Sequence, residues 1–181
     1  MESTPHADWV RMALERFEQP LLRYALRITG DMETAQDVVQ DTFLKLCLAD
    51  RMKIQEYLVP WLYRVCRNRA LDVRKKEQRM QTVDPATLAA QPSPQPAPRA
   101  VAQGRETETL ALEAFSELPE NQQEVFRLKF QEQLSYKEIS EVTGFPVANV
   151  RYLIHISLKK VRAVLREQLE QMPPAFKETL Q

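Results

Sequence analysis

The chain has 181 residues, of which 44% are hydrophobic, and its 25 basic and 25 acidic side chains give a formal net charge of zero. This length allows one domain or two small ones, and the charge excludes a nucleic-acid-binding protein that is basic over its whole surface. Few glycines and no alternating runs of β-branched residues predict an all-α fold. No apolar run approaches the roughly 18 residues of a membrane span, so a cytoplasmic chain without membrane insertion is expected.

The first helical segment begins near residue 17, where apolar residues start to recur at helical spacing, and Gly30 provides its C-terminal stop. Pro20 is predicted either to kink this helix or to start a new one. Asp31 is a predicted N-cap for the helix that follows. A loop near 49–54 is expected to end that second helix.

A long helix is predicted over residues 57–79, with Leu58, Leu62, Val65 and Cys66 on one apolar face. Tyr63 and Asn68 lie away from that face and are expected to be exposed, whereas Trp61 taken alone is more typical of a core. An aromatic ring beside Arg and Asn on one helix can stack on an unpaired base while the cations hold the nucleic-acid backbone.

Charge is distributed unevenly along these two helices. Residues 31–41 carry four acids and no base, whereas residues 64–79 carry seven bases against Asp72 and Glu77. Either run alone is typical of a solvated helix face. Together they indicate an acidic surface for a basic protein partner and a basic surface for phosphates.

A proline-rich stretch divides the chain. Residues 82–105 contain five prolines, few charges and no aromatic residue. This composition favours an extended linker over a packed domain. The predicted domains are therefore a helical unit at 1–80, a linker at 81–105, a second helical unit at 106–172 and a short tail at 173–181.

The second unit begins with a predicted helix over 115–131 that has Pro119 in its first turn. Ser135 and Glu138 fit the S-x-x-E pattern of a helix N-terminus, and Gly144 offers a turn before another helical stretch. A helix-turn-helix is therefore predicted.

A helical wheel divides residues 148–165 into two faces. The predicted core face holds Val150, Ile154, Ser157, Leu158, Val161, Val164 and Leu165, with Leu153 at its edge. The opposite face holds Tyr152, His155, Ile156, Lys159 and Arg162, with Arg151 and Lys160 at its borders. Such a face can donate hydrogen bonds, contact phosphates and touch thymine methyl groups. The alternative is a solvated helix of a small bundle.

Signs of catalysis or metal binding are absent from the sequence. Cys47 and Cys66 lie among apolar neighbours and are predicted to be buried free thiols. Without a C-x-x-C pair or a histidine cluster, no metal and no cofactor are expected. The acids at 31–41 have no partner histidine, because His6 falls in a terminus expected to be loose. An enzyme is therefore not expected.

Three segments, taken in their order along the chain, resemble the segments of a known family. They are LLRYALRITGDMETAQDVVQDTFLKLC (21–47), WLYRVCRNRALDVRKKEQR (61–79) and LPENQQEVFRLKFQEQLSYKEISEVTGFPVANVRYLIHISLKKVR (118–162). They resemble, in turn, the polymerase-binding, −10-element and −35-reading segments of extracytoplasmic-function (ECF) sigma factors of the sigma-70 family. The resemblance implies two small helical domains, sigma2-like and sigma4-like, joined by the proline-rich linker.

The resemblance also implies partners. RNA polymerase core would be bound through the clamp of its largest subunit and the flap of its second largest subunit. Promoter DNA would be opened at the −10 element and read at the −35 element, without catalysis by the chain itself. An anti-sigma factor is a further expected partner, because one is common in the family.

Site residues are carried over on the same resemblance. At the −10 element they are Trp61, Tyr63, Arg64, Arg67, Asn68, Arg74 and Lys75. At the −35 element they are Ser135, Tyr136, Asn149, Arg151, Tyr152, His155 and Lys159. For polymerase they are Asp31, Glu33, Asp37, Gln40 and Asp41.

The chain departs from the family pattern in two places. The family more commonly has a basic residue at the positions of Leu153 and Ile156, and many family linkers are acidic where this one is nearly uncharged. Two other functions stay open from the residues alone. One is a helix-turn-helix regulator that acts without polymerase, and the other is a polymerase-binding interaction protein with reduced promoter reading.

Overall fold

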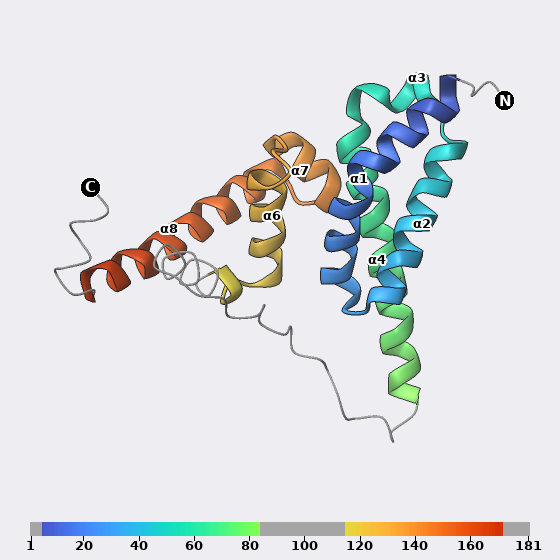
Figure 1. The fold of residues 1–181 in the computed structure, drawn as a ribbon. Helices are drawn as coiled ribbons and strands as arrows, with labels where there is room; N and C mark the ends of the chain where they lie inside the picture. Colours follow the sequence, from blue (N-terminus) through green and yellow to red (C-terminus); the bar gives the residue numbers. More distant parts are fainter. Residues whose placement is uncertain (1–4, 84–114, 172–181) are drawn as a thin grey trace, which may run out of the picture. The chain divides into compact units, whose positions relative to one another are not determined.

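Helices make up both described parts of the chain. A computed structural model describes residues 5–83 and 115–171, and no strand occurs among them (Figure 1). The chain divides into two units, one N-terminal and one C-terminal. The predicted all-α fold of two helical domains is confirmed. Residues 84–105 of the predicted linker and the tail at 173–181 lie outside the described residues.

The N-terminal unit is a bundle of three long helices. In chain order its elements are α1 (Pro5–Thr29), α2 (Met32–Leu48), α3 (Arg51–Ile54), a 3₁₀ turn (Gln55–Tyr57) and α4 (Leu58–Val83). α1, α2 and α4 lie side by side and each packs on the other two (Figure 1). Their shared core includes the fully buried residues Leu21, Ala25, Val38, Leu46 and Leu62. Burial of this apolar area is the main force that holds the bundle together.

Local signals set the junction between α1 and α2. Gly30 adopts φ +78°, a left-handed conformation that glycine accepts without strain, and its N–H donates to the Leu26 carbonyl oxygen at 2.8 Å. The Asp31 carboxylate then accepts a hydrogen bond from the Thr34 N–H at 2.8 Å. The predicted stop and the predicted N-cap are both confirmed.

The beginning of the chain differs from the prediction. α1 starts at Pro5 and runs without interruption through Pro20. His6, expected in a loose terminus, lies in this helix, and its Nε2–H donates to the Cys47 carbonyl oxygen at 3.0 Å. That contact joins the first turn of α1 to the last turn of α2. The predicted loop near 49–54 also contains a short helix, α3, which the Asp50 carboxylate caps by accepting from the Met52 N–H at 3.0 Å.

The C-terminal unit has three described helices, α6 (Glu120–Phe130), α7 (Tyr136–Thr143) and α8 (Val147–Gln171). Ser135 and Glu138 form a reciprocal capping box at the start of α7, and Gly144 ends the helix with φ +78°. The predicted helix-turn-helix signals are therefore confirmed. α6, α7 and α8 all contact one another, and their core includes Val125, Leu128, Ile139, Val142, Val150 and Ile154.

Candidate nucleic-acid and polymerase interfaces

One face of α4 points away from the core of the N-terminal unit. Trp61, Arg64, Asn68 and Lys75 lie on it, because their spacing of three, four and seven residues keeps them on one side of a helix. Asn68 and Lys75 are exposed, and Trp61 and Arg64 are half-buried. These four residues are called the α4 outer face below. It combines an aromatic ring, an amide and two cations.

Tyr63 does not belong to the α4 outer face. Its side chain is fully buried, and its ring meets Tyr24 of α1 edge-on at a centroid distance of 5.1 Å and an angle of 71°. The prediction that Tyr63 is exposed is therefore wrong. Because α1 and α2 both pack on α4, the core arc of α4 turns toward Tyr63, and it leaves Leu58 and Val65 only half-buried.

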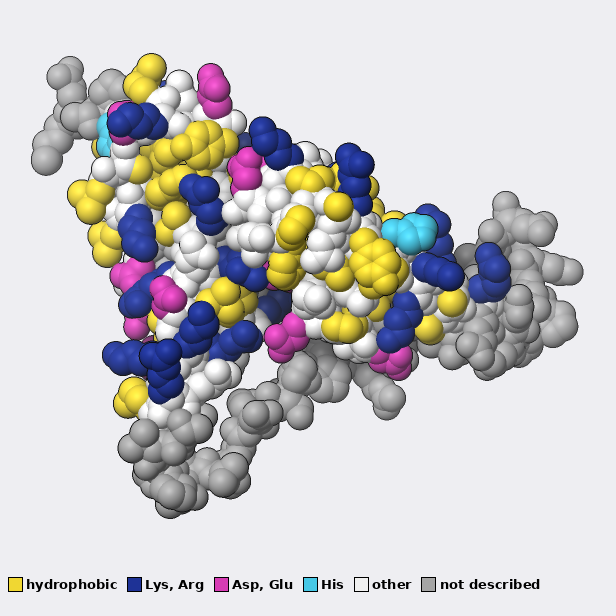
Figure 2. Space-filling model, turned by 180° about the vertical axis from the view of Figure 1, so that it is seen from behind, with side chains coloured by type: hydrophobic (Ala, Val, Ile, Leu, Met, Phe, Trp, Pro, Cys, Tyr) yellow, Lys and Arg dark blue, Asp and Glu magenta, His cyan; other side chains and the backbone are white. Residues whose placement is uncertain are grey.

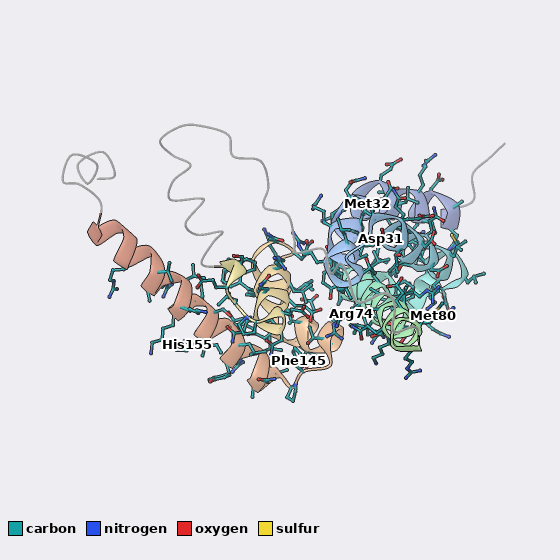
Figure 3. All side chains as sticks on the ribbon, turned by 90° about the horizontal axis from the view of Figure 1, so that it is seen from below. Asp31, Met32, Arg74, Met80, Phe145 and His155 are labelled. Carbon is teal, nitrogen blue, oxygen red and sulfur yellow. The ribbon has the colours of Figure 1, made fainter. Side chains whose placement is uncertain are left out.

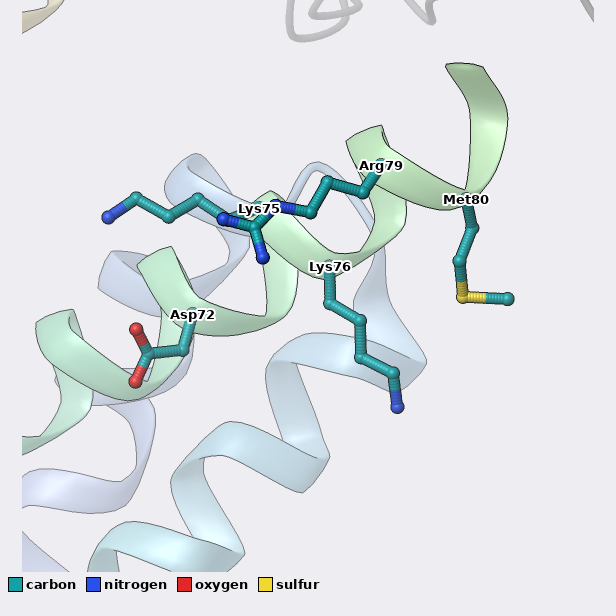
Figure 4. Close-up of a pocket in the computed structure, with 5 residues that line it drawn as sticks. All are labelled: Asp72, Lys75, Lys76, Arg79 and Met80. Carbon is teal, nitrogen blue, oxygen red and sulfur yellow. The ribbon is translucent and has the colours of Figure 1, made fainter. Parts of the chain in front are cut away.

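The remaining cations of α4 lie on its flank and toward its C-terminal end. Arg67 and Arg74 are half-buried, and Arg74 is marked in Figure 3. Further along, a shallow hollow is lined by Asp72, Lys75, Lys76, Arg79 and Met80. Figure 4 shows Lys75 and Arg79 extending along one side of the helix, while Lys76 and Met80 point to the other. Figure 2 shows blue Lys and Arg side chains gathered toward this end of α4. The C-terminal part of the basic run therefore forms an exposed, positively charged surface.

The outward face of α2 holds the predicted polymerase-binding acids, with one exception. Glu33, Asp37 and Gln40 are exposed and lie on one stripe. Asp41 instead turns toward α4, where its Oδ2 lies 2.6 Å from the Arg69 Nε, and the two side chains are 38% and 42% exposed. Asp41 therefore links α2 to α4.

Asp31 is exposed at the start of α2, where its carboxylate also caps the helix (Figure 3). Hydrogen bonds from the backbone N–H and the side chain of Thr34 lower the pKa of its carboxyl group, and burial opposes them weakly. The carboxylate is therefore charged at neutral pH. This favours the helix N-terminus, where the backbone dipoles attract negative charge.

An apolar continuation of the α2 stripe was not predicted from the sequence. Leu44 is 61% exposed and Leu48 is 88% exposed, and both follow Glu33, Asp37 and Gln40 on the outward side. Helical spacing alone could have found them, because both lie opposite the buried Val39 and Phe43 arc. An acidic half followed by an apolar half is a surface suited to a protein partner.

The outward face of α8 carries most of the predicted −35 residues. Asn149, Arg151, Tyr152, His155 and Lys159 are all exposed, and His155 is marked in Figure 3. Leu153 is only 5% exposed, so it belongs to the core and does not face outward. Ile156 is half-buried. The unusual apolar residue at 153 therefore leaves the outward face unchanged.

The other two predicted −35 residues lie at the start of α7. The Ser135 hydroxyl oxygen accepts from the Glu138 N–H at 3.2 Å, and the Ser135 N–H donates to the Glu138 carboxylate at 2.7 Å. Tyr136 is half-buried, and the Arg151 guanidinium lies over its ring, 5.5 Å from the centroid. α7 and α8 are thus joined on the outward side by this ring contact.

The two cysteines have different surroundings. Cys66 is buried, and burial raises the pKa of its thiol to about 12, against a smaller lowering by the Thr42 side chain. Cys47 is exposed at the end of α2, so the prediction that it is buried is wrong. It lies on the outward side of an amphipathic helix, where apolar neighbours in sequence do not imply burial.

Iodoacetamide at pH 8 should therefore modify Cys47 within minutes and leave Cys66 unmodified in the folded chain, because only the thiolate reacts. Mass spectrometry of tryptic peptides, with and without urea, checks this. Modification of Cys66 at the same rate without urea would contradict the buried position.

The described residues offer neither a metal site nor a membrane span. Residues 5–83 and 115–171 contain no group of three or more His, Cys, Asp or Glu side chains placed to bind a metal ion together. Over the same residues, no helix combines the length and apolar character needed to cross a bilayer.

Known protein families match both units of the chain. The family model described as Sigma-70 region 2 matches residues 13–80, and the one described as Sigma-70, region 4 matches residues 109–161. The chain is 25% identical over 150 residues to the ECF RNA polymerase sigma factor SigM of Bacillus subtilis, covering 83% of this chain and 91% of SigM. It is 28% identical over 171 residues to the RNA polymerase sigma factor YlaC of the same organism, covering 90% and 97% of the two chains.

A solved structure shares the fold. The sigma factor RpoE of Bartonella quintana, crystallised with the anti-sigma factor NepR, superposes with a TM-score of 0.60 at 18% identity, over 86% of this chain and 96% of that one. Matches to both units, in the order expected, favour a sigma factor over a helix-turn-helix regulator that acts without polymerase. The chain therefore belongs to the ECF class of sigma-70 family sigma factors, which bind RNA polymerase core and direct promoter-specific initiation of transcription.

Proposed function

We propose that this sigma factor divides its work among three surfaces, namely the outward stripe of α2, the α4 outer face and the outward face of α8. The observation that carries the proposal is the separation of charge within the N-terminal unit. Glu33 and Asp37 face outward on α2, whereas Arg64 and Lys75 face outward on α4. A chain with zero net charge thus presents one surface suited to a basic protein and another suited to phosphates.

The α4 outer face is proposed to open and hold the −10 element. A base that leaves the duplex loses stacking and pairing, and an aromatic side chain and an amide can replace both. Trp61 offers the stacking surface and Asn68 the base-edge hydrogen bonds. Arg64 and Lys75, with Arg67 and Arg74 on the flank, would contact phosphates and fix the register of the strand.

The α2 stripe is proposed to dock on the clamp of the largest polymerase subunit. Its acidic half, Glu33 and Asp37 with Gln40, would steer the encounter, and Leu44 and Leu48 would supply apolar area. Asp31 borders this surface at the helix N-terminus. Asp41 contributes indirectly, by holding α2 against α4 through Arg69.

The C-terminal unit is proposed to read the −35 element and to bind the flap of the second largest subunit. Arg151 lies in the first turns of α8, the end by which recognition helices enter the major groove. Asn149, Tyr152 and His155 lie beside it on the exposed face, and Lys159 is placed two turns further along for a phosphate. Ser135 and Tyr136 flank the groove-facing side from α7.

An anti-sigma factor is a further proposed partner of the chain. The structure of the Bartonella quintana relative is a complex with an anti-sigma factor, which supports a partner of the same kind for this chain. No catalytic step is assigned to the chain, because initiation chemistry belongs to polymerase. The relatives are bacterial, and bacterial transcription takes place in the cytoplasm, which is the compartment proposed here.

Reversing the charge of the α2 stripe tests the docking surface. The double substitution Glu33→Lys and Asp37→Lys should lower affinity for core polymerase by about tenfold or more, because like charges then face each other in the interface. Titration of labelled chain with purified core polymerase at two salt concentrations measures the change. Both residues are exposed and do not contribute to the core, so the thermal unfolding midpoint should fall only slightly, through the loss of the favourable Glu33 charge in the first turn of α2.

A matched control is available on α1. Glu15→Lys with Glu18→Lys makes the same change in net charge at exposed positions of α1, outside the α2 stripe. Core affinity should then stay near that of the unchanged chain. Equal weakening by both double variants would show that net charge, and not the α2 stripe, governs binding.

A further inference from the structure

The ring of Tyr136 is contacted by cations from the two neighbouring helices of the C-terminal unit. The Lys129 Nζ of α6 lies 5.0 Å from the ring centroid, and the Arg151 Cζ of α8 lies 5.5 Å from it. Tyr136 is itself the first residue of α7. One side chain thus joins all three described helices of this unit on its outward side.

The ring is held in place by the surrounding backbone. Tyr136 directly follows the N-cap residue Ser135, whose N–H and hydroxyl are both fixed by the capping box with Glu138. Lys129 is fixed as well, because its ammonium donates to the Leu134 carbonyl oxygen at 3.2 Å. The half-buried ring is therefore a rigid platform beside an exposed arginine.

An exposed arginine without such a platform samples many rotamers. Ordering it into one rotamer on binding costs conformational entropy. A cation that lies over the face of an aromatic ring is attracted by the quadrupole of that ring. The N–H donors of a guanidinium point outward in its own plane. The ring contact can therefore orient Arg151 while leaving its donors available for the two acceptors of a guanine edge.

We propose that Tyr136 is a positioning residue for promoter reading. Its ring holds the Arg151 guanidinium in the orientation that reads a guanine of the −35 element. The inference rests on the proposed role of Arg151 and adds a residue that acts through it. Tyr136 then sets the sharpness of base discrimination without needing a base contact of its own.

The test uses the full chain assembled with core polymerase and a promoter library randomised over the −35 element. Tyr136→Leu should lower discrimination at the one base pair that Arg151 reads by about two- to fivefold, the size of an exposed cation–π contact. Preferences at the other positions should stay the same. Tyr136→Phe keeps the ring and should retain the discrimination of the unchanged chain.

A double-mutant cycle separates positioning from direct contact. In the Arg151→Ala background, Tyr136→Leu should cause no further loss at that base pair. Full additivity of the two losses would mean that Tyr136 contacts DNA independently, and the inference would be overturned. It would also be overturned by an equal loss at every −35 position, which indicates a structural role, or by unchanged discrimination in Tyr136→Leu when Arg151→Ala does change it.

If Tyr136→Leu fails to fold, as judged by circular dichroism, Tyr136→Met removes the ring with a more adaptable side chain and replaces it in the cycle. If Arg151→Ala leaves every base preference unchanged, the assignment of Arg151 as a base reader fails. That outcome rejects the proposed −35 surface itself and is distinct from the outcomes that reject only the role of Tyr136.

Discussion

Tyr63→Ala should lower the free energy of unfolding of the N-terminal unit by about 3–5 kcal/mol, the range for truncating a large buried aromatic side chain. The ring is fully buried between helices and packs edge-on against Tyr24. Removing it leaves a cavity, because the neighbouring helices close the space only in part. Urea denaturation followed by circular dichroism measures the loss.

Two control variants give this prediction its specificity. Tyr63→Phe keeps the ring against Tyr24 and should retain most of the stability. Asn68→Ala, at an exposed position five residues along the same helix, should leave the urea midpoint unchanged but reduce discrimination at the −10 element by about 1–3 kcal/mol. The opposite result, a stable Tyr63→Ala chain that has lost −10 discrimination, would show that the ring faces DNA.

Features coded by adjacent residues could be predicted from the sequence. The stop at Gly30, the N-cap at Asp31 and the capping box of Ser135 and Glu138 all depend on groups within four residues of one another. A left-handed glycine or a capping hydroxyl satisfies the helix end wherever the helix later packs. The two-unit helical fold follows from these signals and from the helical spacing of apolar residues.

The rotation of a helix against its neighbours could not be predicted in the same way. Leu58 and Val65 were expected in the core of α4, but the packing of α1 and α2 turns that helix so that Tyr63 and Ala70 are buried instead. A wheel gives the arc of apolar residues, and tertiary packing decides where its centre lies. The Tyr63 ring is apolar, so it can be buried where it packs edge-on against Tyr24.

Contacts between residues far apart in the chain could not be predicted from the sequence either. Asp41 and Arg69 each belonged to a run of like charge that was assigned to an outside partner, yet they pair with each other at 2.6 Å. They are 28 positions apart, and no local pattern joins them. The candidate surfaces are therefore smaller than the charge runs, because one member of each run, Asp41 and Arg69, links α2 to α4.

The −35 surface gives the second large expected effect. Arg151→Ala should reduce discrimination at one base pair of the −35 element by about 1–3 kcal/mol, the value of a good bidentate contact to guanine. The same promoter library, transcribed by polymerase carrying each variant, measures the preference at every position. Arg151 is exposed and outside the core, so the free energy of unfolding should change little.

Lys160→Ala removes the same charge from the same helix and is the matched control. Lys160 is exposed, but its ammonium donates to the Glu117 carbonyl oxygen at 3.3 Å, so it is directed toward the chain before α6 and not along the outward face. Base preferences should therefore be unchanged in this variant. An equal, sequence-independent weakening in both variants would make Arg151 a phosphate contact, since phosphate contacts position a protein on DNA without reading its sequence. The outward face of α8 would then select promoters through Asn149, Tyr152 and His155, and the tether to polymerase would supply most of the affinity.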